Sequence, residues 1–234
     1  MQHISQVEVK KPIQTASRTT SYMRSNTGAH PVADFMRQRL GFGGKAALKT
    51  LDSYDPSWQP KPEHRRSCQK AHEVAKAFLE EGRSLVFFGP NGVGKTHLAL
   101  GIGNALLERY GSANAPALFI GFGDALAQLR KTYQGSYEGQ GESFYLERWV
   151  TIPVLILDEI GQRGLEQEPS EFTRRIGYAL IDGRYRRGLP IVITTNKNPN
   201  DLCAWITESA VDRLWEMGRF VKMEGKSWRQ SGHR

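Results

Sequence analysis

Residues 87–100, which read FFGPNGVGKTHLAL, constrain the fold more than any other stretch of the chain. Residues 89–96 fit the pattern G-x-x-x-x-G-K-[ST], which binds phosphate where it follows a strand and opens a helix. That context is present, because the apolar run SLVFFG precedes the loop and a helix-forming segment up to Gly111 follows it. The sequence therefore predicts a P-loop domain of the α/β class.

The rest of the chain continues the alternation of short apolar runs and helical segments. Strands are expected at 84–89, 117–122, 153–160 and 189–196, and helices at 62–82, 95–111, 124–134 and 168–188. Strands that are apolar on both sides and separated by helices predict a parallel sheet flanked by helices on both faces. We expect Asp124 to cap the helix that it opens.

Composition excludes several other classes of protein. The longest apolar runs are far too short to span a bilayer, and the N-terminus lacks the apolar core of a signal peptide. We therefore expect a cytoplasmic protein with no membrane partner. Cys68 and Cys203 are the only cysteines, and neither has a partner at zinc spacing, so both are expected to be reduced thiols.

The loop offers several groups to a nucleoside triphosphate. Backbone N–H groups and the positive end of the following helix would surround the phosphates. Lys95 would reach the β- and γ-phosphates, and the Thr96 hydroxyl would bind Mg²⁺. The other expected contacts of the loop are Gly89, Pro90, Asn91, Gly92, Val93 and Gly94. A chance glycine-rich turn is disfavoured, because the pattern and its context agree.

Two acids and an amide follow the predicted strands. Asp158 could hold the magnesium through water, and Glu159 could polarise the attacking water. An Asp-Glu pair is usually a cap or a solvated turn, but after PVLIL and downstream of a P-loop it favours hydrolysis. Asn196, at the end of residues 194–196, could orient the water or could simply open a turn.

Two arginines are further candidates. Arg213, in SAVDRL, could be an arginine finger supplied to the nucleotide of a neighbouring subunit. The alternative is a surface residue or an ion pair. Arg229, in GKSWR, is a weaker candidate for a contact with the γ-phosphate.

The N-terminal part is basic and reads as a separate arm. We expect residues 1–47 to form the arm and residues 48–234 the ATPase domain. The net charge is +8, and residues 1–83 account for +6 of it. Such an arm suggests a polyanion, usually nucleic acid, or else a solvated tail. Residues 31–41 have the spacing of a short amphipathic helix, which could dock a partner or pack on its own domain.

Five segments occur in an order that resembles the DnaC/IstB group of AAA+ ATPases. These are GPNGVGKTHLALGIGNAL, VLILDEIG, ALIDGRYRRGLPIVITTN, AVDRLWEMG and GKSWR, and the resemblance covers about residues 48–230. It implies one AAA+ domain without a full helical lid, with ATP and Mg²⁺ as ligands and His97 among the nucleotide contacts. Asp158 and Glu159 match Walker B, Asn196 matches sensor I, and Arg213 matches a trans-acting finger in an open homo-oligomer.

The resemblance also implies a contact with single-stranded DNA. In the family, the segment between the second helix and the Walker B strand touches DNA, and here it spans residues 129–149. Arg130, Lys131, Tyr133 and Tyr137 mix positive charge with stacking rings, as single-strand binding requires. An ordinary surface loop is the alternative, and it is supported by the acids Glu138, Glu142 and Glu147.

Two functions follow from the resemblance. The first is an ATP-dependent loader that delivers a DnaB-type hexameric helicase in DNA replication. In this function, the 31–41 helix would bind the helicase. The short arm favours this function, although it lacks the cysteines of the zinc domain that some loaders carry. The second is an IstB-like transposition ATPase that bends duplex DNA and recruits a transposase. The acid pair disfavours a small-molecule kinase, and the intact Lys95 and Thr96 disfavour a purely structural nucleotide.

Overall fold

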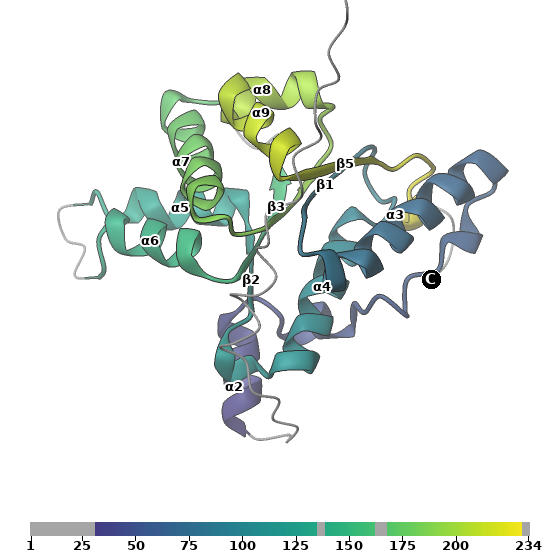
Figure 1. Ribbon diagram of the computed structural model, residues 1–234, viewed down its shortest axis with the longest axis horizontal. Helices are drawn as coiled ribbons and strands as arrows, with labels where there is room; N and C mark the ends of the chain where they lie inside the picture. Colours follow the sequence, from purple (N-terminus) through teal and green to yellow (C-terminus); the bar gives the residue numbers. More distant parts are fainter. Residues whose placement is uncertain (1–30, 135–138, 162–167, 231–234) are drawn as a thin grey trace, which may run out of the picture.

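The computed structural model describes residues 31–134, 139–161 and 168–230 (Figure 1). Its centre is one sheet with the strand order β2-β3-β4-β1-β5, in which every neighbouring pair is parallel. The strands are β1 (Ser84–Phe88), β2 (Ala117–Gly121), β3 (Val154–Ile160), β4 (Ile191–Thr195) and β5 (Gly218–Lys222). The first four confirm the expected strands. The fifth was not predicted, because GRFVK is short and carries two cations.

Helices cover both faces of the sheet, as expected (Figure 1). They are α2 (Pro31–Arg39), α3 (Pro62–Glu81), α4 (Lys95–Tyr110), α5 (Phe122–Lys131), α6 (Glu142–Thr151), α7 (Glu171–Arg187), α8 (Pro199–Ile206) and α9 (Glu208–Met217). On one face, α4 lies over β2, β3 and β4, and α3 lies over β1 and β5. On the other, α5 lies over β2 and β3, α9 lies over β1 and β5, and α7 packs on α6, α8 and α9.

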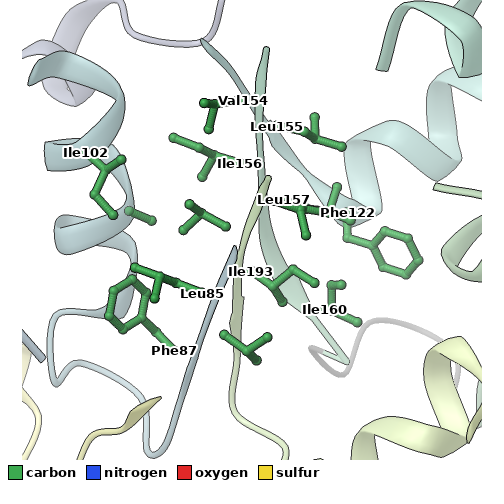
Figure 2. Close-up of a cluster of buried hydrophobic side chains, with 14 of the residues drawn as sticks. Leu85, Phe87, Ile102, Phe122, Val154, Leu155, Ile156, Leu157, Ile160 and Ile193 are labelled. Carbon is green, nitrogen blue, oxygen red and sulfur yellow. The ribbon is translucent and has the colours of Figure 1, made fainter. Parts of the chain in front are cut away.

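Alternate side chains of the central strands pack into two apolar layers, one on each face of the sheet. Figure 2 shows Ile156 of β3 beside Ile102 of α4, whereas Leu155 and Leu157 lie on the opposite side of the strand, with Phe122 of α5. Leu155, Ile156 and Leu157 are all completely buried. The strand is therefore apolar from Val154 to Leu157 because both of its faces are covered there.

Two local expectations need correction. The helix expected at 124–134 begins at Phe122, and its N-cap is Gly121, so the prediction that Asp124 caps it is wrong. Asp124 instead lies in the first turn, where a carboxylate is favourable beside the helix N-terminus. Residues 142–151 form α6, so most of the second half of the 129–149 segment is helical rather than a loop.

The segment that follows α2 packs against the domain. Leu40 and Phe42 are buried in the same core as the strands, and the Phe119 N–H on edge strand β2 donates to the Leu40 carbonyl at 2.8 Å. On α4, Gly103 is required because a Cβ there would overlap the Phe42 ring. The helix expected at 31–41 is confirmed as α2, while the boundary at residue 47 stays a prediction.

Among the described residues, no helical lid follows β5. After β5, the residues up to 230 contain one short 3-10 helix, η5 (Trp228–Gln230). None of the helices in the described ranges is both long and apolar enough to cross a bilayer.

Candidate functional site: a nucleotide cavity at the strand ends

A cavity of about 390 Å³ opens at the C-terminal ends of β3 and β4. Four parts of the chain line it: the 49–58 segment, the P-loop with the start of α4, the two strand ends, and residues 228–229. Its volume lies within the range of pockets that bind small molecules and cofactors. The carboxyl ends of parallel strands are also where ligands bind in open α/β sheets.

The P-loop is folded around its own lysine. Lys95 Nζ donates to the carbonyl oxygens of Gly89 at 2.8 Å and Pro90 at 2.7 Å. Burial lowers the pKa of Lys95 to about 8, against the attraction of Asp158 and Glu159. The loop therefore holds a poorly solvated cation, and a phosphate beside it would stabilise its charged form.

The glycines of the loop serve two purposes. Gly94 caps α4 in a left-handed conformation with φ +102°, which leaves the first N–H groups of the helix without a side-chain cap. At Gly92, a Cβ would overlap Ser227, so only glycine lets the C-terminal segment approach. Of the predicted loop contacts, Asn91, Gly92, Val93, Gly94, Lys95, Thr96 and His97 line the cavity, whereas Gly89 and Pro90 do not.

Asp158 is buried beside the cavity, does not itself line it, and accepts two hydrogen bonds. Its Oδ1 accepts from Thr96 Oγ1 at 3.0 Å and from Thr194 Oγ1 at 2.5 Å. Burial raises the pKa of this carboxyl, and the bonds from Thr194 and Thr96 oppose that rise. The side chains of the P-loop, β3 and β4 thus meet at one carboxylate.

Glu159 is turned out of the strand by a local irregularity. The β3–β4 register shifts between Leu157 and Ile160, and Glu159 has φ +60°. Its N–H donates to Thr194 Oγ1 at 2.9 Å, and its exposed side chain lines the cavity. A non-glycine residue in this conformation costs of order 1–3 kcal/mol, and such strain clusters at functional sites. Asn196, directly after β4, also lines the cavity.

Oxygen ligands for a magnesium ion are available at the same place. Thr96 lines the cavity, and its hydroxyl oxygen lies 3.0 Å from Asp158 Oδ1. Within the described ranges, no three or more His, Cys, Asp or Glu side chains form a metal cluster. Mg²⁺ is usually held by one or two protein ligands together with substrate phosphates and water. These two side chains fit that pattern.

Residues 49–58 form one wall of the cavity, which we call the roof, and the sequence motifs do not predict it. The buried Tyr54 donates its hydroxyl to the Val93 carbonyl at 3.0 Å. His97 holds the same segment, since its Nε2 lies 3.0 Å from both Ser53 Oγ and the Thr50 carbonyl. The proline-rich composition of residues 53–62 is typical of a loop or linker. The signal that could have corrected this is the pair of large aromatic residues, Tyr54 and Trp58, which flexible linkers rarely contain.

Residues 225–229 close the cavity from the opposite end of the chain. The fully buried Gln59 donates to the Lys226 carbonyl at 3.1 Å and accepts from the Lys226 N–H at 3.0 Å. The Trp228 N–H donates to the Gly92 carbonyl, and its ring meets that of Trp58 edge-on at 5.1 Å. Arg229, predicted as a weak candidate, is thereby brought into the cavity wall.

The remaining candidates lie away from this cavity. Arg213, on α9, is not among its lining residues and pairs with Asp182 instead. Arg130 ends α5 with Lys131, and Tyr133 follows them. Tyr137 lies outside the described residues.

Three comparisons place the chain among known proteins. Residues 36–234 match the family described as IstB-like ATP binding protein. The ATP-binding protein of insertion sequence IS5376 from Geobacillus stearothermophilus is 30% identical over 77% of this chain and 68% of its own length. The replicative helicase loader DnaC of Escherichia coli (strain K12) is 30% identical over 63% of this chain and 56% of its own length.

A solved structure has the same fold. The crystal structure of the DnaC helicase loader superposes with a TM-score of 0.61 at 25% identity, covering 78% of this chain and 100% of that one.

Proposed function

Because this chain belongs to the IstB-like ATP binding protein family, we propose that it hydrolyses ATP with Mg²⁺ in the cavity at the strand ends. The observation that carries the proposal is the placement of Glu159. Its backbone N–H, in a strained conformation, donates to Thr194, which also bonds the neighbouring Asp158, and Glu159 is exposed and lines the cavity. A site that only bound nucleotide would not need a second acid fixed in this way.

Each lining group has a role in this mechanism. Lys95 would leave the Gly89 and Pro90 carbonyls and bind the β- and γ-phosphates, where its charge regains a partner. Thr96 and Asp158 would hold Mg²⁺, which neutralises charge on the phosphate oxygens. Glu159 would accept a proton from the attacking water, and Asn196 would orient that water.

The roof and the C-terminal segment would enclose the nucleotide. Tyr54 and the edge-on pair of Trp58 and Trp228 offer apolar surface for the base. Arg229 would lie near the γ-phosphate, since it shares the cavity wall with Lys95.

We also propose that the surface at the end of α5 binds single-stranded DNA. Two guanidinium groups contact the ring of Phe172 on α7, with Arg130 and Arg175 each 5.4 Å from its ring centre. The Tyr133 ring meets Phe172 edge-on at 6.1 Å and is 60% exposed. Exposed rings beside cations suit sequence-tolerant stacking. Lys131 adds a further exposed cation.

Two of the three acids of this segment, Glu142 and Glu147, are paired with arginines, and Glu138 lies outside the described residues. Arg175 binds Glu142 at 2.8 Å, and Arg187 binds Glu147 at 3.1 Å. Both carboxylates are therefore neutralised by α7. Tyr133 also hydrogen-bonds Glu142, which orients its ring.

We propose that the ATPase works as a homo-oligomer, with Arg213 of one subunit completing the site of the next. Arg213 cannot serve its own cavity in the observed arrangement, because it lies on α9 beside α7. In this proposal, Arg213→Ala binds ATP normally and loses turnover.

Helicase loading is the cellular role that we favour. It is supported by the likeness to the DnaC crystal structure, all of whose chain is covered. The exposed face of α2, with Phe35 56% exposed, would hold a DnaB-type hexameric helicase. The second candidate is transposition with a transposase partner, and it is favoured by the insertion-sequence relative, which covers more of this chain than DnaC does.

DNA preference distinguishes the two roles. The ATPase rate is measured for the chain alone, with single-stranded DNA and with duplex, and Glu159→Gln provides the inactive control. Stimulation mainly by single strands supports the loader, and stimulation mainly by duplex supports transposition. Lys131→Ala with Tyr133→Leu should weaken single-strand binding. Lys70→Ala on α3 is the matched control, since it removes one exposed lysine from the other face of the sheet.

Helicase docking needs a surface variant rather than a truncation. Removing residues 1–47 would also remove Leu40 and Phe42 from the core. Phe35→Ser leaves the core intact and should abolish co-purification with a DnaB-type helicase. Undiminished co-purification would refute the role of α2.

A further inference from the structure

Arg213 is held in a fixed position by side chains of α7. Its Nε lies 3.1 Å from Asp182 Oδ1, at ion-pair distance but without the alignment of a hydrogen bond. Its guanidinium carbon lies 5.2 Å from the ring centre of Tyr178 and 5.5 Å from that of Tyr185. Nη1 donates to the Ser209 carbonyl at 3.0 Å.

The residues around Arg213 are themselves immobilised. The Tyr185 hydroxyl donates to Glu216 at 2.7 Å, which ties its ring to α9. Two residues after Asp182 on α7, the fully buried Arg184 donates to the carbonyls of Trp149, Ile152, Pro153 and Pro190. The turn that carries Asp182 is thus anchored at the N-terminal ends of β3 and β4.

The Asp182 carboxylate does not cancel the charge of Arg213. Its other oxygen, Oδ2, binds Arg186 at 2.7 Å, so one buried carboxylate is shared by two arginines. Arg213 Nη2 has no acceptor among the described residues. Its side chain is 25% exposed, whereas that of Asp182 is 11% exposed. Asp182 and Ser209 therefore hold the Nε and Nη1 side of the guanidinium, while Nη2 remains available to a further acceptor.

A free arginine side chain has many rotamers, and restricting it on contact costs up to about 2 kcal/mol. If the side chain is already restricted in the folded protomer, an arginine that contacts a phosphate on another subunit does so at a smaller entropy cost. Misplacement by about 1 Å can lower a rate by about 100-fold.

We infer that Asp182 is the positioning residue for Arg213, holding its guanidinium between Tyr178 and Tyr185 in the orientation required by the neighbouring active site. This inference rests on the proposed role of Arg213 as a trans-acting finger. Asp182 does not line the nucleotide cavity of its own subunit, so in this inference it acts through Arg213.

A double-mutant cycle on the full-length protein tests the inference. Asp182→Asn, Arg213→Ala and the double variant are compared by kcat, KM for ATP, nucleotide affinity and thermal midpoint. Asp182→Asn should lower kcat by about 10–100-fold while KM and nucleotide affinity change little. In the Arg213→Ala background it should lower kcat no further, because its effect acts through that arginine. Arg186→Ala, which removes the other partner of Asp182, should keep wild-type kcat.

The possible failures are distinguishable. If Arg213→Ala kept full turnover, the finger and the positioning role would both be wrong. If Arg213→Ala were inactive but Asp182→Asn turned over normally, only the positioning role would be overturned. A further loss in the double variant would also overturn it. Should Asp182→Asn not fold, Tyr178→Leu takes its place, because it removes one ring and leaves the Asp182–Arg186 pair. A wild-type kcat for that variant would overturn the part of the inference that requires the guanidinium to be held between the two rings.

Discussion

Replacing Lys95 with methionine should change how the stability of the nucleotide-free protein depends on pH. Lys95 is 7% exposed, and its burial lowers its pKa from 10.5 to about 8. At 1.36 kcal/mol per pKa unit, keeping this group charged costs the folded state about 3 kcal/mol. Methionine fills a similar volume and carries no charge, so this cost is absent from the variant.

The sign follows from proton counting. Below about pH 8, Lys95 is protonated in both states, and the folded wild type carries the full cost. Between about pH 8 and 10.5, the unfolded chain binds more protons, so wild-type stability rises with pH. Relative to Lys95→Met, the wild type should gain about 3 kcal/mol across that window. The lost bonds to Gly89 and Pro90 shift the variant's stability by a similar amount at every pH.

Urea unfolding of both proteins at pH 7, 8, 9 and 10 measures this difference. All other titrating groups are shared, so the difference isolates Lys95. Curves that stay parallel within about 1 kcal/mol would refute the reasoning, because they would mean that the lysine is solvated in the free protein. In addition, ATP with Mg²⁺ at 100 times its Kd should stabilise the wild type by about 2.7 kcal/mol and should not stabilise the variant.

Three further substitutions test other parts of the site. Glu159→Gln should keep ATP affinity and lower kcat by about 10²–10⁴-fold, since it removes the proton acceptor, and steady-state kinetics with a binding titration measure both. Thr194→Val should cost about 1–3 kcal/mol in urea unfolding, because the Glu159 N–H loses its acceptor and Asp158 a donor. The lost bond also raises the pKa of Asp158, so the deficit should be larger at pH 7 than at pH 4. Gln59→Leu should destabilise by a similar amount and weaken ATP binding, because both backbone groups of Lys226 lose their partner.

Each of these has a control and a contradicting result. Glu159→Gln with wild-type turnover would remove the assigned base. Thr194→Ser keeps the hydroxyl and should behave like the wild type, so an equal loss in Ser and Val variants would point to packing instead. Gln69→Leu, on the exposed surface of α3, is the control for Gln59→Leu, and equal ATP affinities in the two variants would contradict the role of residues 225–229.

Local patterns in the sequence were sufficient for β1 to β4 and for the phosphate site. The apolar runs at β1, β3 and β4 are buried on both faces, so their composition alone predicts covered parallel strands. Residues 89–96 place the P-loop groups by themselves, because one turn and one helix start determine where the N–H groups point. Parallel strands also bring their carboxyl ends to one edge, which predicts Asp158 beside that loop.

Tertiary structure alone decided what surrounds those groups. Gln59 meets Lys226, Asp158 meets Thr194, and Asp182 meets Arg213, each pair from segments that are far apart along the chain. The edge strand β5 and the roof at Tyr54 likewise depend on what they pack against. Spacing and periodicity record only which face of one element a residue occupies. Which faces then meet depends on how whole helices and strands pack together, and a single sequence carries no spacing signal for that.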